Sequence, residues 1–155
     1  MSNRIKVMAA AEYSENVSET ARSYRAALLD LEDAYENAAG IHAVDYTRTR
    51  VQTSLKGDVM ADAIQRIDGM VARLAEAVSG YADAVEEYDR CLSRMSRASA
   101  SVLRAHYVRA EPWSSIADSL GYTPGYVRGK VRDAALAELY DVMPMEWRVP
   151  QAEER

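Results

Sequence analysis

Three basic side chains that lie close together in the sequence, Arg128, Lys130 and Arg132, are the residues best suited to a definite chemistry. Asp133 is the only acidic residue between them and Glu138, so this stretch has a local excess of positive charge. Contacts with the phosphates of a nucleic acid require such an excess. The pattern therefore predicts a phosphate-binding surface on whatever element carries these side chains.

Residues 113–139 have the pattern of a helix-turn-helix whose second helix continues toward the C-terminus. Gly121 gives the backbone the freedom to leave the first helix, and Thr123 and Pro124 suit the cap and first turn of the second. The small Ala117 lets the two helices cross closely beneath the turn. The side chains expected to face inward are Ile116, Ala117, Leu120, Val127, Val131 and Ala134.

A helical wheel of the second helix predicts which of its residues point away from the core. Gly125 and Gly129 lie on that exposed face with Arg132, although a glycine costs a helix about 1 kcal/mol relative to alanine. We expect the two glycines to let the helix backbone approach DNA, or a partner helix, closely; simple tolerance of a weak helix is the alternative. The residues predicted to face a DNA groove or its phosphates are Thr123, Gly125, Tyr126, Arg128, Gly129, Lys130 and Arg132.

Residues 60–95 carry a second strong pattern, apolar side chains at alternating steps of four and three, and residues 17–38 show the same steps. This is a heptad repeat, with Ile64 at an a position. The g positions hold small apolar residues where a two-stranded coiled coil has Glu and Lys, so the stripe is wide enough for two neighbouring helices. We expect two chains to pair their helical hairpins into a four-helix bundle. The predicted core of that bundle comprises Ile64, Ile67, Val71, Leu74, Val78, Tyr81, Val85, Tyr88 and Leu92.

The expected fold is all-α, with a long heptad-patterned helical hairpin followed by a C-terminal three-helix domain that contains the helix-turn-helix. The expected boundaries are 1–96 for the hairpin, which serves oligomerisation, 97–143 for the helix-turn-helix domain and 144–155 for a flexible tail. Residues 40–57 show no sustained period and are expected to connect the two long helices.

Composition limits the classes of protein that fit. Of the 155 residues, 48% are hydrophobic and 28% are charged, which is typical of a globular chain. No apolar run approaches the ~20 residues of a membrane span, and the first residues lack the apolar core of a signal peptide. We therefore expect a cytoplasmic protein that makes no contact with a membrane.

The net charge of −5 is unevenly distributed along the chain. Residues 1–96 hold 11 basic and 16 acidic residues, a balance of −5, whereas residues 97–140 hold 6 and 4, a balance of +2. An acidic scaffold is thus separate from a mildly basic module. So small an excess predicts weak DNA affinity per module, so that binding requires dimerisation or a helper protein.

No arrangement of residues predicts an enzyme active site. His42 and His106 are the only histidines, and neither has Cys, Asp or Glu at the spacing of a metal site. Cys91 lies within the apolar heptad stripe, as a buried structural thiol does. We therefore expect no catalytic residue, no metal ligand and no cofactor.

Arg104, His106 and Tyr107 form an R-x-x-Y-like element, and the sequence WSSIADSLGYT follows it at residues 113–123. In this arrangement the chain resembles region 4 of the sigma-70 family. With VQTSLKGD at residues 51–58 and the long helix, it resembles more specifically a family of small phage-encoded regulators related to late-operon activators. The resemblance implies DNA-dependent transcription regulation in a phage or prophage, with RNA polymerase as a candidate partner.

Three functions fit these patterns. The first is a DNA-binding transcription regulator that dimerises through its heptad helices and reads double-stranded DNA with the helix from about Thr123 to Tyr140. The second is a phage DNA-packaging subunit similar to a small terminase, in which the DNA module typically comes first in the chain, not last. The third is a sigma-like module that binds RNA polymerase and not DNA. A homodimer favours the regulator, and a larger ring favours packaging.

Overall fold

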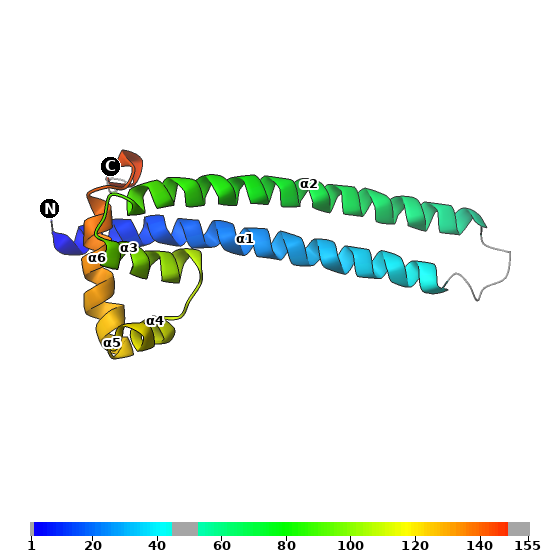
Figure 1. Ribbon diagram of the computed structural model, residues 1–155. Helices are drawn as coiled ribbons and strands as arrows, with labels where there is room; N and C mark the ends of the chain where they lie inside the picture. The colour runs from blue at the N-terminus through cyan, green and yellow to red at the C-terminus, as the bar shows by residue number, and fades with distance from the viewer. Residues whose placement is uncertain (1, 45–52, 149–155) are drawn as a thin grey trace. The chain divides into compact units, whose positions relative to one another are not determined.

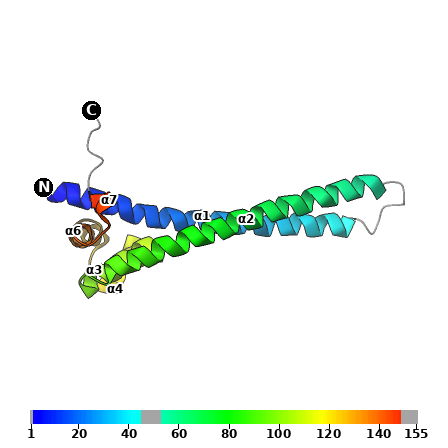
Figure 2. The ribbon, with the colours of Figure 1, turned by 90° about the horizontal axis from the view of Figure 1, so that it is seen from above.

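The computed structural model describes the backbone of residues 2–44 and 53–148 and the side chains of residues 2–38 and 58–148. Over these residues the protein is all-α, as the sequence predicts. α1 (Asn3–Val44) and α2 (Thr53–Leu92) pack side by side as a helical hairpin, which Figures 1 and 2 show from two directions. The middle of the predicted connector, residues 45–52, lies outside the described part of the chain.

Short helices follow the hairpin and form the predicted helix-turn-helix (Figure 1). They are α3 (Arg97–Leu103), the π-helical turn η2 (Arg104–Val108), α4 (Trp113–Leu120), α5 (Pro124–Tyr126), the π-helical turn η3 (Val127–Val131), α6 (Arg132–Tyr140) and α7 (Met145–Arg148). α5, η3 and α6 follow one another without a break, so together they form one second helix.

The chain divides into two compact units. Unit 1 comprises Met1–Ala21 and Ala82–Arg155, and unit 2 comprises Arg22–Tyr81. The division after residue 96 that the sequence suggests does not coincide with this boundary. The reason is that the first turns of α1 and the last turns of α2 share a core with the short helices.

Large aromatic side chains of α1 and α2 lie at the centre of unit 1. Tyr13 and Tyr88 are almost fully buried, with ring centroids 5.6 Å apart. The Tyr13 hydroxyl donates to Glu87 Oε1 at 2.9 Å, and the hydroxyls of Ser14 and Tyr88 lie 2.9 Å apart, so these polar atoms are satisfied. Burial raises the pKa of both tyrosines above the ordinary range. Other large buried side chains of this core include Leu92, Leu103, Tyr107, Leu136, Leu139, Tyr140 and Met143.

Unit 2 contains the remaining parts of α1 and α2, and none of its described side chains is fully buried. The two helices are joined there by contacts such as the stacked rings of Tyr24 and Tyr81, whose centroids are 5.7 Å apart. The predicted bundle core therefore separates into three groups. Val85, Tyr88 and Leu92 belong to the core of unit 1, Ile67, Leu74 and Tyr81 are partly buried in unit 2, and Ile64, Val71 and Val78 are exposed.

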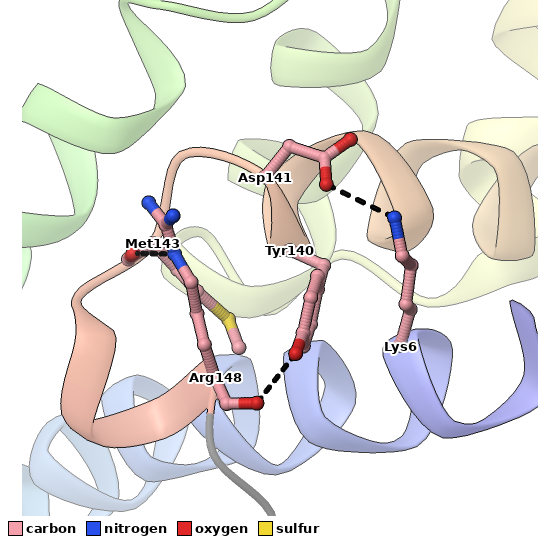
Figure 3. Close-up of polar contacts among 5 residues, drawn as sticks. All are labelled: Lys6, Tyr140, Asp141, Met143 and Arg148. Atoms are coloured by element: carbon pink, nitrogen blue, oxygen red, sulfur yellow. Dashed lines mark hydrogen bonds and ion pairs between the residues drawn. The ribbon is translucent and has the colours of Figure 1, made fainter. Parts of the chain in front are cut away.

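The start of the expected flexible tail, residues 144–148, packs against the core of unit 1. Trp147 packs against the core of unit 1, with its ring 5.4 Å from that of Tyr13. Figure 3 shows the polar contacts: the Tyr140 hydroxyl donates to the carbonyl of Arg148, whose Nε donates to the Met143 carbonyl at 2.6 Å. Residues 149–155 lie outside the described part of the chain.

Candidate nucleic-acid interface

The turn between α4 and the second helix has the geometry that the sequence predicts. Gly121 ends α4 in the left-handed conformation, with φ of 73°. The Tyr122 N–H donates to the Ala117 carbonyl at 3.1 Å, and the Gly121 N–H donates to the Asp118 carbonyl at 3.4 Å. These two bonds form a Schellman motif, in which glycine is favoured because it has no Cβ to clash.

The start of the second helix also follows local rules. Thr123 has extended backbone angles, and its side-chain oxygen accepts the N–H of Tyr126 at 3.4 Å. Pro124 occupies the first helical position, where its missing N–H costs nothing. The predicted cap is confirmed, and it fixes the direction in which the second helix leaves the turn.

A small core beneath the turn holds α4 against the second helix. Ala117 and Val127 are fully buried at its centre, which confirms the predicted need for a small residue at the helix crossing. Trp113 packs against both this cluster and the main core of unit 1, and it stacks on His106 at 3.9 Å between centroids. His106 Nδ1 lies 2.9 Å from the Glu111 carbonyl, so this histidine has a packing role.

The π-helical turn η3 changes which residues of the second helix face inward. Val127, Val131 and Ala135 point to the core at steps of four residues, whereas Ala134 is exposed. The prediction that Ala134 faces inward is therefore wrong, because a π turn holds more residues than the 3.6 per turn that a helical wheel assumes. Leu120 was also expected inward and is exposed at the last position of α4.

The same shift moves Arg132 away from the exposed face on which the wheel places it. Its side chain is only 32% exposed, donates a hydrogen bond to the buried Tyr107 and pairs with Asp133 at 3.7 Å. Burial raises the pKa of Tyr107, and the bond from Arg132 partly opposes that rise. Of the three basic residues, Arg132 is thus the one that is tied into the scaffold.

The other predicted contact residues share one exposed surface at the start of the second helix. Arg128 and Lys130 are exposed there, and within the described part of the chain neither pairs with an acidic side chain. We call this set the second-helix surface: Thr123, Gly125, Tyr126, Arg128, Gly129 and Lys130.

Tyr122, which no sequence pattern singles out, lies in the turn beside this surface. Tyr122 and Tyr126 are both about half exposed, with ring centroids 5.0 Å apart. Two adjacent exposed aromatic rings extend the second-helix surface across the turn. The only sequence signal for Tyr122 is that it directly follows Gly121, where a helix has just ended.

The two glycines of the second-helix surface have no structural reason within the described part of the chain. A Cβ at Gly125 or Gly129 would meet nothing within 4 Å, and neither residue has a positive φ. Only Gly121 requires the conformational freedom of glycine in this region. The two glycines therefore lower the stability of the helix, and neither packing nor backbone conformation in the described structure requires them.

The R-x-x-Y-like element attaches the helix-turn-helix to the two long helices. Arg104 pairs with Asp89 of α2 at 3.1 Å, and Tyr107 is buried in the core of unit 1. The Tyr107 carbonyl accepts a hydrogen bond from Ser18 of α1 at 2.9 Å. These residues anchor η2 to both helices of the hairpin and do not reach the second-helix surface.

Among the described residues, no group of three or more His, Cys, Asp or Glu side chains is placed to hold a metal ion. The single cysteine, Cys91, is buried in the core of unit 1. None of the helices in the described ranges combines the length and hydropathy needed to cross a membrane.

Comparison of the chain with protein-family models, with curated proteins and with solved structures finds no match.

Proposed function

We propose that the protein is a DNA-binding transcription regulator of phage or prophage origin that acts as a homodimer in the cytoplasm. The second-helix surface enters a groove of double-stranded DNA, with Arg128 and Lys130 placed to contact phosphates. Arg132 acts indirectly, because it holds the second helix on Tyr107.

The observation that carries this proposal is the placement of Gly125 and Gly129 beside two exposed cations, Arg128 and Lys130, which pair with no acidic side chain in the described part of the chain. Neither glycine is required by packing or by backbone conformation in the described structure. Their cost of about 1 kcal/mol each is explained if the helix backbone must approach another molecule closely. Arg128 and Lys130 on the same surface indicate that this molecule is an anion.

The test measures stability and DNA affinity of the double variant Gly125→Ala/Gly129→Ala. We expect unfolding to require up to about 2 kcal/mol more free energy, because two exposed helical glycines are replaced by alanine. We expect affinity for fragments of the surrounding genomic locus, measured by fluorescence anisotropy, to fall about tenfold, or roughly 1.4 kcal/mol.

The matched control is Gly69→Ala/Gly80→Ala in α2, where a Cβ also meets nothing within 4 Å. This pair should gain the same stability and keep the affinity of the wild-type protein. Unchanged DNA affinity in the Gly125/Gly129 variant would reject the close-approach argument.

A second variant tests the electrostatic part of the proposal. Arg128→Ala/Lys130→Ala removes the two exposed cations and leaves Arg132 in its structural contacts. The slope of log affinity against log salt should become shallower by about 1.8, since each lost phosphate contact accounts for about 0.9. If the wild-type protein binds no fragment at low salt, DNA binding is rejected, and a polymerase-binding or purely structural role remains.

A further inference from the structure

Three exposed apolar residues of α2 in unit 2 follow a strict heptad repeat, although Leu29 and Val59 are also exposed outside it. Ile64, Val71 and Val78 occupy successive a positions of α2 and are 56%, 43% and 42% exposed. By contrast, the d and g side chains from Ile67 to Tyr81 are partly buried against α1. In unit 2, the side chains at the d and g positions of α2 thus pack within the chain, whereas those at the a positions remain exposed to solvent.

The a positions of both helices lie on one side of the hairpin. In an α-helix the a position is rotated about 60° from d. Because α1 and α2 run antiparallel and turn their d positions toward each other, this rotation brings both sets of a residues to the same side. Tyr35 of α1, which is 56% exposed, and Leu28 are the α1 residues at these positions. We call Leu28, Tyr35, Ile64, Val71 and Val78 the a-face.

The opposite side of the hairpin has a different character. An open groove lies there between the helices, and its walls mix small side chains with charged ones. Its lining contains none of the a-face residues and comprises Ser23, Ala26, Ala27, Asp30, Met70, Arg73, Glu76 and Ala77. The groove side of the hairpin therefore does not repeat the heptad row of large apolar residues found on the a-face.

We infer that the a-face is the surface on which a second copy of this chain packs, so that two hairpins close into a four-helix bundle. This inference deepens the dimerisation in the proposed function by assigning its interface. It also changes the sequence prediction, because the d residues of α2 are already occupied by α1, and the a residues alone remain for the partner.

The period of the a-face is the first argument for a second copy. A seven-residue repeat of β-branched residues at a positions is suited to helices that follow the same repeat, and α1 and α2 of another copy provide such helices. Ala61 and Ala75, at the exposed e positions beside Ile64 and Val78, let a partner helix approach closely.

Charge and size agree with this occupant. The charged residues that border the a-face at e positions are of both signs, Arg25 on one hand and Glu32 and Asp68 on the other, so two copies are not repelled. From Ala61 to Val78 the face is about 25 Å long, and two packed helices make it about 20 Å wide. The product of these lengths is a flat area on the order of 500 Å². The accessible surface is larger than this flat area because side chains project from it, so the face is comparable with one side of a standard interface, ~800 Å² of accessible surface.

The test compares two valine substitutions on opposite sides of α2. Val71→Arg places a charge in the centre of the a-face, whereas Val59→Arg makes the same change at a c position, where the valine is 46% exposed. Both sites are exposed and arginine is a good helix former, so both variants should fold. Light scattering coupled to gel filtration at micromolar concentration should give the wild-type protein and Val59→Arg twice the chain mass of 17.2 kDa, and Val71→Arg a single chain mass.

A monomeric wild-type protein, a Val71→Arg variant that remains dimeric or a larger ring would each overturn the inference. The Arg128→Ala/Lys130→Ala variant should remain a dimer, since its changes lie in unit 1. The two failures are therefore distinguishable. If the protein does not bind DNA, anisotropy shows no binding while light scattering still gives the mass of a dimer. If the a-face is not the interface, light scattering shows the unexpected mass in the absence of DNA.

Discussion

Units 1 and 2 each contain parts of the same two long helices, yet only unit 1 completes a hydrophobic core. All of the fully buried side chains in the described structure, including Tyr13, Tyr88 and Leu136, belong to unit 1. In unit 2 the inward side chains are only partly buried, because two helices alone cannot cover each other's apolar stripes. The short C-terminal helices supply the missing cover in unit 1, and we propose that a second copy supplies it in unit 2.

Contacts with the two long helices support the helix-turn-helix. Arg104, Tyr107 and Trp147 all connect the short helices to the first turns of α1 or the last turns of α2. The module that we expect to bind DNA is thus part of the better-packed unit. Precise presentation of groove-contacting residues requires such a support, whereas oligomerisation requires an apolar surface that the chain itself leaves open.

The largest expected effect contrasts one leucine from each unit. Leu136→Ala empties a fully buried position of unit 1 and should lower the free energy of unfolding by about 3–4 kcal/mol. Leu74→Ala in unit 2 removes a partly buried side chain and should cost roughly half as much. Urea unfolding followed by circular dichroism measures both. Equal losses would mean that unit 2 is packed as well as unit 1, and the comparison would fail.

A smaller effect is expected at high pH, where the buried tyrosines of unit 1 ionise. Burial raises the pKa of Tyr13, Tyr88 and Tyr107 above the ordinary value of about 10. A raised pKa means that the folded state favours the neutral phenol, so this stability is fully present below pH 10 and is lost as the pH rises further. The free energy of unfolding should therefore fall steadily above about pH 10.

Tyr107→Phe separates one of these contributions. The variant loses the hydrogen bond from Arg132, which should cost about 1 kcal/mol at neutral pH. Above pH 10 its stability should decline less steeply than that of the wild-type protein, because one ionising group is gone. Parallel curves for the two proteins would show that Tyr107 is not shielded by the core of unit 1.

The parts of the helix-turn-helix that follow local rules are predictable from sequence. Gly121, Thr123 and Pro124 each satisfy a backbone requirement that involves only neighbouring residues, and Ala117 satisfies a requirement for small volume at a crossing. The two long helices are predictable for a similar reason, because their heptad repeat is visible over many turns.

The errors arise where tertiary packing overrides the regular helix. The π turn at Val127–Val131 exchanges Ala134 for Ala135 at the core and draws Arg132 out of the exposed face, yet no residue type marks it in the sequence. The contact of Trp147 with Tyr13 joins residues that are far apart in the sequence, so no local pattern fixes it. The a-face cannot be predicted from the heptad pattern, because a and d positions are both apolar and the pattern does not show which of them α1 covers.

The smallest expected effect concerns the link between α3 and α6 inside unit 1. The Glu138 carboxylate accepts hydrogen bonds from the backbone N–H and the hydroxyl of Ser96, at the start of α3. The backbone hydrogen bond is the main reason that the pKa of Glu138 is lowered, with further support from Ser99 and Ser96 hydroxyls.

A lowered pKa means that this stability is present above the unfolded value of about 4.3 and is lost as the pH falls through the folded value. Glu138→Gln should therefore be less stable than the wild-type protein at pH 7, and the difference should shrink as the pH falls below 4. Because the group is largely exposed, the difference at pH 7 should be small, and a constant difference across this range in urea unfolding would show that charge does not stabilise the link.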